Sequence, residues 1–226
     1  MRSVKEFLLW VRRGLFFGDG NQIIYLYNAT GQKLSKTVLQ TGAITTTDYL
    51  SGFQYKNTIL QFFPQAEGYV NATQNVTSYT FNYVFNYTDH LGNIRLSYGL
   101  DRGVLTILEE NNYYPFGLKQ ENYNVTKKQY EKHNGEPELV TCVNCAYKYK
   151  YNGKEFQDEL GLNFYDYGAR NYDPAIGRWM NIDPLAEQYR RWTPYNYCVD
   201  NPMRFVDPDG MGVDDVIING AERQKA

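Results

Sequence analysis

Short strand-like runs that alternate with tight turn signals are the feature that most constrains the fold of this chain. Residues 22–27 and 33–39 flank the sequence Asn-Ala-Thr-Gly at positions 28–31. Asparagine and glycine tolerate the positive φ angles of hairpin turns, so the pattern predicts two antiparallel strands joined by a turn. In a chain built this way, each strand pairs with the strand that follows it.

The same unit recurs further along the chain. Residues 78–87 and 94–99 flank Asp-His-Leu-Gly at positions 89–92, and a looser copy begins with Asp-Glu-Leu-Gly at positions 158–161. Residues 48–70 are typical of another hairpin, around their Lys-Asn step. The spacing between the copies is irregular, which indicates a degenerate hairpin repeat and not a solenoid of fixed period.

The composition supports a fold that is mainly β. The chain has 226 residues, which is enough for one ordinary domain with a real core. It contains 22 tyrosines and 12 phenylalanines. Because a tyrosine ring packs well on a half-buried pleated surface while its hydroxyl reaches water or a partner, this excess favours strands over helices.

Two segments depart from the strand pattern. Residues 1–17 place apolar side chains at near-helical spacing, which predicts a short amphipathic helix that packs on the first strands. Residues 119–141 are rich in asparagine, lysine and glutamate and have few apolar anchors. We expect a surface loop or a short helix there.

The charge pattern argues against several classes of partner. Lysine and arginine total 23 against 25 aspartates and glutamates, and neither sign forms a long block. The charge pattern therefore gives no electrostatic argument for binding to nucleic acid or to an anionic membrane. The longest N-terminal apolar run, residues 7–11, is far below the roughly 18 residues of a membrane-spanning helix and does not resemble a signal peptide.

Three cysteines are too few for a disulfide framework in a chain of this size. Cys142 and Cys145 have the C-x-x-C spacing of half a zinc site, and His133 with Cys198 would complete four ligands. A loop disulfide and plain thiols are the alternatives. We expect no metal and no cofactor.

Aromatic turns and three Asp-Pro steps mark the segment 151–211. Its motifs are Tyr-Asp-Pro-Ala-Ile-Gly-Arg-Trp at 172–179, Asn-Ile-Asp-Pro at 181–184, Tyr-Asn-Tyr-Cys-Val-Asp-Asn-Pro at 195–202 and Asp-Pro-Asp-Gly-Met at 207–211. Together they resemble the RHS repeat-associated core domain, the module that closes YD-repeat proteins of bacteria. That family usually ends its last motif in leucine, where this chain has Met211.

The resemblance implies an architecture in which hairpins wind into a spiralling sheet around a hollow shell, with a C-terminal plug or closing segment. It divides the chain into an entry segment or short helix (1–21), YD-repeat-like hairpins (22–118), a polar loop (119–145), a core-associated domain (146–211) and a short tail (212–226). It further implies a fragment of a secreted or cell-surface polymorphic toxin. The expected partners are an upstream YD-repeat shell and a C-terminal effector in a longer parent chain.

The resemblance also implies chemistry. The family's core domain resembles an intramolecular aspartyl protease that cuts after the terminal motif, here between Met211 and Gly212, and the matching residues are Arg178, Asp183 and Asp207. Two neighbouring carboxylates push their pKa values apart, so that one serves as acid and the other as base. The arginine would hold one carboxylate or polarise the scissile carbonyl.

Each of these residues also has a plainer interpretation. Asp183 would cap a short helix at 184–188, Asp207 would open a β-turn with Gly210 in the left-handed region, and Asp173 would be a turn residue. A second functional hypothesis follows from the aromatic hairpins: a non-enzymatic surface or adhesion fragment that binds carbohydrate or a protein partner.

Overall fold

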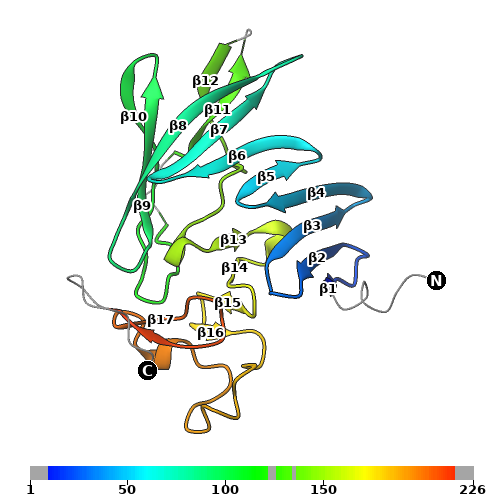
Figure 1. Ribbon diagram of the computed structural model, residues 1–226, viewed down its shortest axis with the longest axis vertical. Coiled ribbons are helices and arrows are strands. Elements are labelled where there is room, and N and C mark those ends of the chain that lie inside the picture. Colours follow the sequence, from blue (N-terminus) through cyan, green and yellow to red (C-terminus); the bar gives the residue numbers. More distant parts are fainter. Residues whose placement is uncertain (1–9, 122–125, 134–135, 217–226) are drawn as a thin grey trace.

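The computed structural model of the chain describes residues 10–121, 126–133 and 136–216, and its regular structure is almost entirely β, which confirms the predicted fold class. Ten strands form one antiparallel sheet in which the order along the sheet is the order along the chain (Figure 1). They are β1 (Trp10–Phe16), β2 (Gln22–Asn28), β3 (Lys33–Gln40), β4 (Ala43–Leu50), β5 (Phe53–Lys56), β6 (Ile59–Gln65), β7 (Gly68–Gln74), β8 (Tyr79–Thr88), β9 (Ile94–Asp101) and β10 (Val104–Glu110).

The predicted hairpins are present. β2 pairs with β3 and β8 pairs with β9, each around its predicted turn. In both turns the first side chain, Asn28 or Asp89, accepts the backbone N–H groups two and four residues ahead. The closing glycines, Gly31 and Gly92, have φ angles of 79° and 77°. The hairpin expected within residues 48–70 lies between β5 and β6.

Two segments that were expected to be helix or loop form strands. Residues 10–16 of the predicted N-terminal helix are β1, which pairs with β2 along its whole length, and residues 1–9 lie outside the described part. A helix of this length is marginal in water, whereas the edge of β2 offers partners for its backbone groups. Within the polar segment, β11 (Lys128–His133) and β12 (Glu136–Thr141) form a hairpin, anchored by the buried ring of Tyr130.

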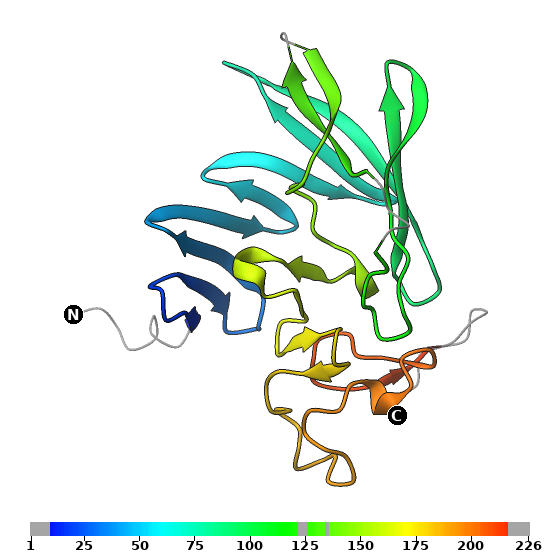
Figure 2. The same ribbon diagram turned by 180° about the vertical axis from the view of Figure 1, so that it is seen from behind.

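Residues 142–216 form an inner segment that begins on the concave side of the curved ten-stranded sheet and ends below the sheet in the view of Figure 1 (Figures 1 and 2). It contains a small antiparallel sheet and a two-stranded pair. The strands are β13 (Glu155–Gln157), β14 (Phe164–Asp166), β15 (Asn171–Asp173), β16 (Arg178–Trp179), β17 (Phe205–Val206) and β18 (Asp214–Asp215), with 3₁₀ turns at Tyr151–Gly153, Glu159–Gly161 and Cys198–Asp200. Nowhere in the described ranges is there a helix with the length and apolar character needed to cross a membrane.

Tyrosine rings build the core of the inner segment. Five tyrosines, one tryptophan and one cysteine form a single buried cluster: Tyr151, Tyr165, Tyr167, Tyr172, Tyr197, Trp179 and Cys198. Buried hydroxyls need partners, and these find them on the chain, as when Tyr172 donates to the carbonyl of Phe116 at 2.7 Å. The excess of tyrosine therefore supplies a hydrogen-bonded core for strands only two or three residues long.

Candidate active site

The terminal motif folds into a turn that wraps around the carboxylate of Asp207. One oxygen of this carboxylate accepts the backbone N–H groups of Gly210 at 2.7 Å and Met211 at 3.1 Å. Gly210 has a φ of 82°, and a Cβ there would lie 3.0 Å from the backbone nitrogen of Arg170. The predicted turn is thus present, and we call residues 207–211 the terminal turn.

The Met211–Gly212 bond directly follows this turn. Met211 is half-buried, and the chain then enters β18, which pairs with β17 on the N-terminal side of the terminal turn. The predicted cleavage bond is therefore flanked by the carboxylate-centred turn on one side and by a short strand pair on the other.

Asp183 caps a turn of its own. Its Oδ1 accepts the backbone N–H of Leu185 at 2.7 Å, as expected for an aspartate before a proline. Residues 184–188 form turns instead of the short helix that was predicted. The other carboxylate oxygen of Asp183 is left to face a different partner.

That partner is Arg170, which joins the two aspartates. Its Nη1 lies 3.0 Å from Asp183 and its Nη2 lies 3.1 Å from Asp207, while its Nε donates to the carbonyl of Gly210 at 2.6 Å. The guanidinium also stacks 4.2 Å from the ring of Trp179. The planar, forked shape of arginine suits this combination of contacts, which a lysine cannot reproduce.

Arg178, the arginine that was expected to hold a carboxylate of the site, lies elsewhere. It is exposed on β16, opposite Asp173, and the structure's described residues show no ion pair between it and either aspartate of the site. The reason is the alternation of side chains along a strand: Trp179 points into the core, so its neighbour points outward. The same alternation would have indicated Arg170, which stands two residues before the buried Tyr172.

The two carboxylates sit in different environments. The Asp207 side chain is completely buried, whereas the Asp183 side chain is 12% exposed. Burial raises the pKa of Asp207 to about 6, although Arg170 and the backbone N–H of Gly210 act in the opposite direction. A carboxyl group with this pKa holds a proton over part of the neutral range, which is what a general acid requires.

The four residues of the hypothetical zinc site are not brought together. Cys142 and Cys145 form a disulfide, so the loop disulfide is the alternative that the structure contains. Cys198 is buried in the tyrosine cluster, where desolvation raises the pKa of its thiol. His133 lies 3.1 Å from Glu138 on the neighbouring strand. In the described ranges, no three His, Cys, Asp or Glu residues gather in an arrangement that would hold a metal ion.

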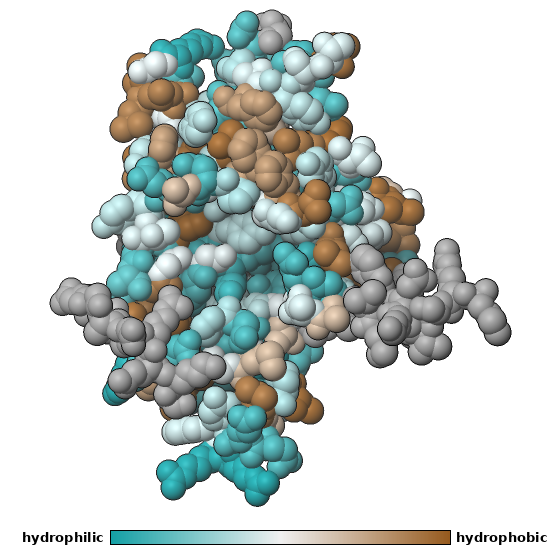
Figure 3. Space-filling view, in the orientation of Figure 1, coloured by the Kyte–Doolittle hydropathy of each residue, from teal (hydrophilic) through white to brown (hydrophobic). Residues whose placement is uncertain are grey.

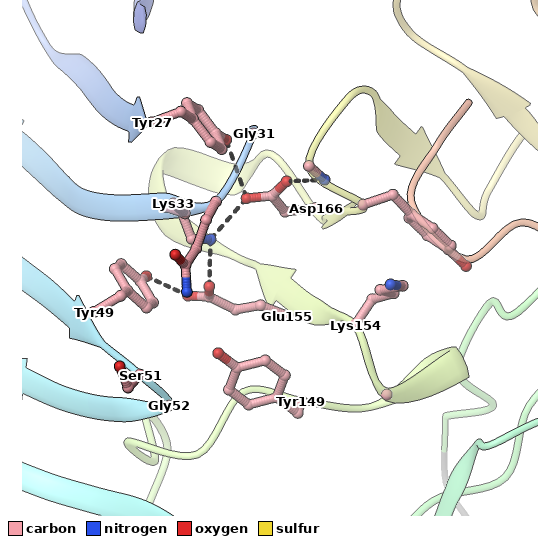
Figure 4. Close-up of a pocket in the computed structure, with 14 residues that line it drawn as sticks. Tyr27, Gly31, Lys33, Tyr49, Ser51, Gly52, Tyr149, Lys154, Glu155 and Asp166 are labelled. Carbon is pink, nitrogen blue, oxygen red and sulfur yellow. Dashed lines mark hydrogen bonds and ion pairs between the residues drawn. The ribbon is translucent and has the colours of Figure 1, made fainter. Parts of the chain in front are cut away.

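A second polar cluster lies at a cavity of about 280 Å³ between the large sheet and the inner segment (Figure 4). Lys33 on β3 contacts Glu155 and Asp166, and the hydroxyl of Tyr49 donates to Glu155. Burial tends to raise the pKa of Glu155, but Lys33 and Lys36 prevail and lower it to about 2. Since these charges satisfy one another, we interpret the cluster as the attachment of the inner segment to the sheet.

Sequence comparisons relate the chain to much longer proteins. It is 34% identical over 122 residues to salivary gland surface protein 1 of Aedes aegypti, a match covering 54% of this chain and 3% of that protein. It is 44% identical over 70 residues to toxin subunit YenC2 of Yersinia entomophaga, which covers 30% of this chain and 7% of the subunit. Toxin subunit YenC1 of the same organism is 41% identical over 63 residues. No family model matches the chain.

The fold is similar to part of a larger solved structure. The crystal structure of TcdB2-TccC3 superposes with a TM-score of 0.58 at 19% identity, over 88% of this chain and 10% of the other. The chain thus corresponds to a small part of each relative. Over these segments the sequence is similar to two toxin subunits, and the fold is similar to part of the TcdB2-TccC3 structure.

Proposed function

We propose that this chain is the closing part of a YD-repeat toxin shell, and that it hydrolyses its own Met211–Gly212 bond to release a C-terminal effector. The observation that carries the proposal is the buried Arg170, which bridges Asp183 and Asp207 beside the terminal turn. The similarity to one toxin subunit over 70 residues supports the relation to a toxin.

The environments of the aspartates suggest their roles. Asp183 is the more exposed and would act as the base that removes a proton from a water molecule as this attacks the Met211 carbonyl carbon. Asp207 is buried with a raised pKa and would donate its proton to the Gly212 nitrogen as the carbon–nitrogen bond breaks. The products are a carboxylate at Met211 and a free amine at Gly212. Because the substrate is part of the same chain, its proximity supplies much of the rate.

The relatives and the sheet support the wider assignment. A parent chain of this kind would place further YD-repeat hairpins before β1 and an effector after the terminal turn, and it would be secreted or held at the cell surface. The proteins it resembles are many times longer than this chain and include two toxin subunits. We assign the ten-stranded sheet to the shell wall and the inner segment to the plug.

The test is self-cleavage in a chain extended with upstream hairpins and a C-terminal reporter domain, followed by intact-mass spectrometry. We expect the wild type to be cut after Met211. Asp183→Asn, Asp207→Asn and Arg170→Lys should each slow cleavage by about 100-fold or more.

Two matched controls come from the same segment. Asp173 caps an Asp-Pro turn just as Asp183 does, through the N–H of Ala175 at 2.8 Å, but it does not contact Arg170 among the described interactions. Asp173→Asn and Arg178→Lys should therefore cleave at the wild-type rate. An extended wild type that stays intact would remove the protease assignment, and cleavage that persists in both aspartate variants would indicate ordinary Asp-Pro lability or a contaminating protease.

A closing segment that does not cleave is the second candidate. Asp183 and Asp207 each cap a turn while bound to Arg170, so the same contacts would also hold a structural plug together. In that case the site variants would lower stability and the wild type would remain intact. The similarity to a salivary gland surface protein is compatible with such a role at a cell surface.

A further inference from the structure

The turn between β8 and β9 contacts the inner segment as well as joining two strands. We call residues 89–93 the wall turn. The side-chain oxygen of Asn93 accepts the backbone N–H of Asn152 at 2.8 Å, and the carbonyl of Leu91 accepts the side-chain amide of Asn152 at 2.8 Å. Asn93 is almost fully buried. The wall turn therefore determines where Asn152 lies.

Asn152 in turn contacts the half of the site that carries Arg170. Its side-chain oxygen accepts the hydroxyl groups of Tyr167 at 2.7 Å and Tyr197 at 2.8 Å. Tyr167 begins the turn that presents Arg170, since its N–H donates to the Arg170 carbonyl at 3.1 Å. Asn152 has a φ of 48°, and a non-glycine residue keeps such a conformation where its surroundings impose it.

Lys154, two residues after Asn152, contacts the half of the site that is formed by the terminal turn. Its Nζ donates to the carbonyl of Pro208 in the terminal turn at 2.5 Å and lies 5.0 Å from the centre of the Tyr167 ring. A cavity of about 320 Å³ is bordered by both turns and by Asn152 and Lys154. The wall turn and the terminal turn are therefore linked through residues 152–154.

We propose that Asn93, Asn152 and Lys154 are positioning residues that couple the shell wall to the cleavage site. The wall turn holds residues 152–154, and these place both Arg170 and the terminal turn. The two halves of the site reach their working geometry once the β8–β9 hairpin has formed in the wall. An effector would then be cut after the wall around it has closed. The consequence for rate rests on the self-cleavage proposed above.

The chain offers two variants at equivalent turn positions to test this coupling. Gln32 occupies in the β2–β3 turn the position of Asn93: each carbonyl accepts the N–H of the first turn residue, and each side chain bonds within its own turn. Of these two side chains, that of Asn93 also accepts a hydrogen bond from the backbone N–H of Asn152. In the extended chain, Asn93→Ala should slow cleavage about 10-fold to 100-fold, because misplacement by about 1 Å has effects of that size. Gln32→Ala should cleave within about twofold of the wild type.

Lys154 provides a test by conservative rescue. Lys154→Met keeps the length of the side chain but removes the donor to Pro208, so it should slow cleavage about tenfold. Lys154→Arg retains a donor and should recover most of the rate. A Lys154→Met variant that is cut at the wild-type rate would mean that the side chain only fills space, which would overturn its positioning role.

Amide hydrogen exchange gives a measurement that does not depend on cleavage. The N–H groups of Gly210 and Met211 are bonded to Asp207, so their protection reports the order of the terminal turn in the uncut chain. We expect Asn93→Ala to speed their exchange about tenfold or more, with the β2–β3 amides unchanged as evidence of folding. If the Gly210 and Met211 amides exchange at the same rate in Asn93→Ala and Gln32→Ala, the coupling is disproved. If no chain is ever cut, the proposed function fails and the exchange data alone decide the coupling.

Discussion

At the scale of single residues, chemically identical side chains differ in the partner that they contact. Asp173 and Asp183 both precede proline and both cap a turn through the same side-chain oxygen. Asp183 differs because its second oxygen meets Arg170, a side chain that is only 2% exposed. A buried guanidinium needs anionic partners, and it finds two of them. The alternation with the buried Tyr172 indicates that Arg170 points inward, but the neighbouring sequence does not indicate which carboxylates it meets.

Removal of Arg170 should destabilise the protein far more than removal of Arg178. Arg170→Met leaves Asp207 buried without its counter-charge, for which we expect a loss of about 3–5 kcal/mol in the free energy of unfolding. Arg178→Met changes an exposed side chain and should cost less than about 0.5 kcal/mol. Urea denaturation of both variants gives the comparison. Similar midpoints would show that Arg170 is not the centre of the site.

The raised pKa of Asp207 predicts how cleavage depends on pH. The proposed acid must be protonated, and with a pKa of about 6 its protonated fraction falls about tenfold for each pH unit above that value. The cleavage rate constant of the extended chain should therefore decrease from pH 6 to pH 8. Time-resolved mass spectrometry across this range measures it. A rate that rises with pH would assign the proton donor elsewhere.

At the scale of elements, an irregularity in one strand positions a buried charged side chain. A bulge between Ile107 and Glu109 shifts the register of β10 against β9, so that Leu108 and Glu109 are buried in succession. The carboxylate of Glu109 then forms an ion pair with Lys150, which lies next to the residues that contact the wall turn. Burial tends to raise the pKa of Glu109, but Lys150 and Lys119 lower it to about 2. The bulge thus helps to hold the inner segment against the sheet.

Two glycines with the same backbone conformation should differ in what they tolerate. Gly117 and Gly103 have φ angles of 82° and 84°, but a Cβ at Gly117 would lie 2.5 Å from the ring of Tyr151, whereas one at Gly103 would meet nothing within 4 Å. Gly103→Ala should lower the free energy of unfolding by about 1 kcal/mol, because alanine is strained at this positive φ. Gly117→Ala should lower it by about 2–4 kcal/mol, because the buried ring must move as well.

Thermal or urea unfolding of the two variants measures the difference between them. Equal costs would mean that the segment after β10 shifts freely against Tyr151. The inner segment would then be attached to the sheet more loosely than its contacts indicate.

At the scale of the whole molecule, the ten-stranded sheet is open. Its end strands, β1 and β10, each pair with one neighbour within that sheet. Phe16 on β1 is 76% exposed, and Val104, Leu105 and Ile107 on β10 are each more than half exposed. Figure 3 shows hydrophobic residues gathered at the upper left, where Figure 1 places β10. Open edges with exposed apolar side chains favour pairing with other strands.

The isolated chain should therefore self-associate as its concentration rises. Phe16→Lys places a charge at the edge of β1 and should weaken that association without lowering stability, since the ring is exposed. Val143→Lys, at a residue that is 94% exposed in the loop closed by the Cys142–Cys145 disulfide, is the control. Sedimentation velocity over a hundredfold concentration range distinguishes them. A wild type that stays monomeric throughout would argue for a self-contained domain.

Much of this protein follows from local sequence. The turns at 28–31 and 89–92 and the strands beside them are determined by residues a few positions apart, because Asn, Asp and Gly tolerate the turn geometry wherever it occurs. The caps at Asp183 and Asp207 are local for the same reason. These features could be predicted from the residues themselves, and the structure contains them.

The tertiary structure alone decided which long-range partners meet. β1 is a strand because the edge of β2 is there to pair with it, and Arg170 replaces Arg178 at the site because the register of β15 and β16 turns Trp179 inward and Arg178 outward. The link from Asn93 to Asn152 spans 59 residues of sequence. Such contacts depend on the sum of packing across the molecule, and no short stretch of sequence carries that information.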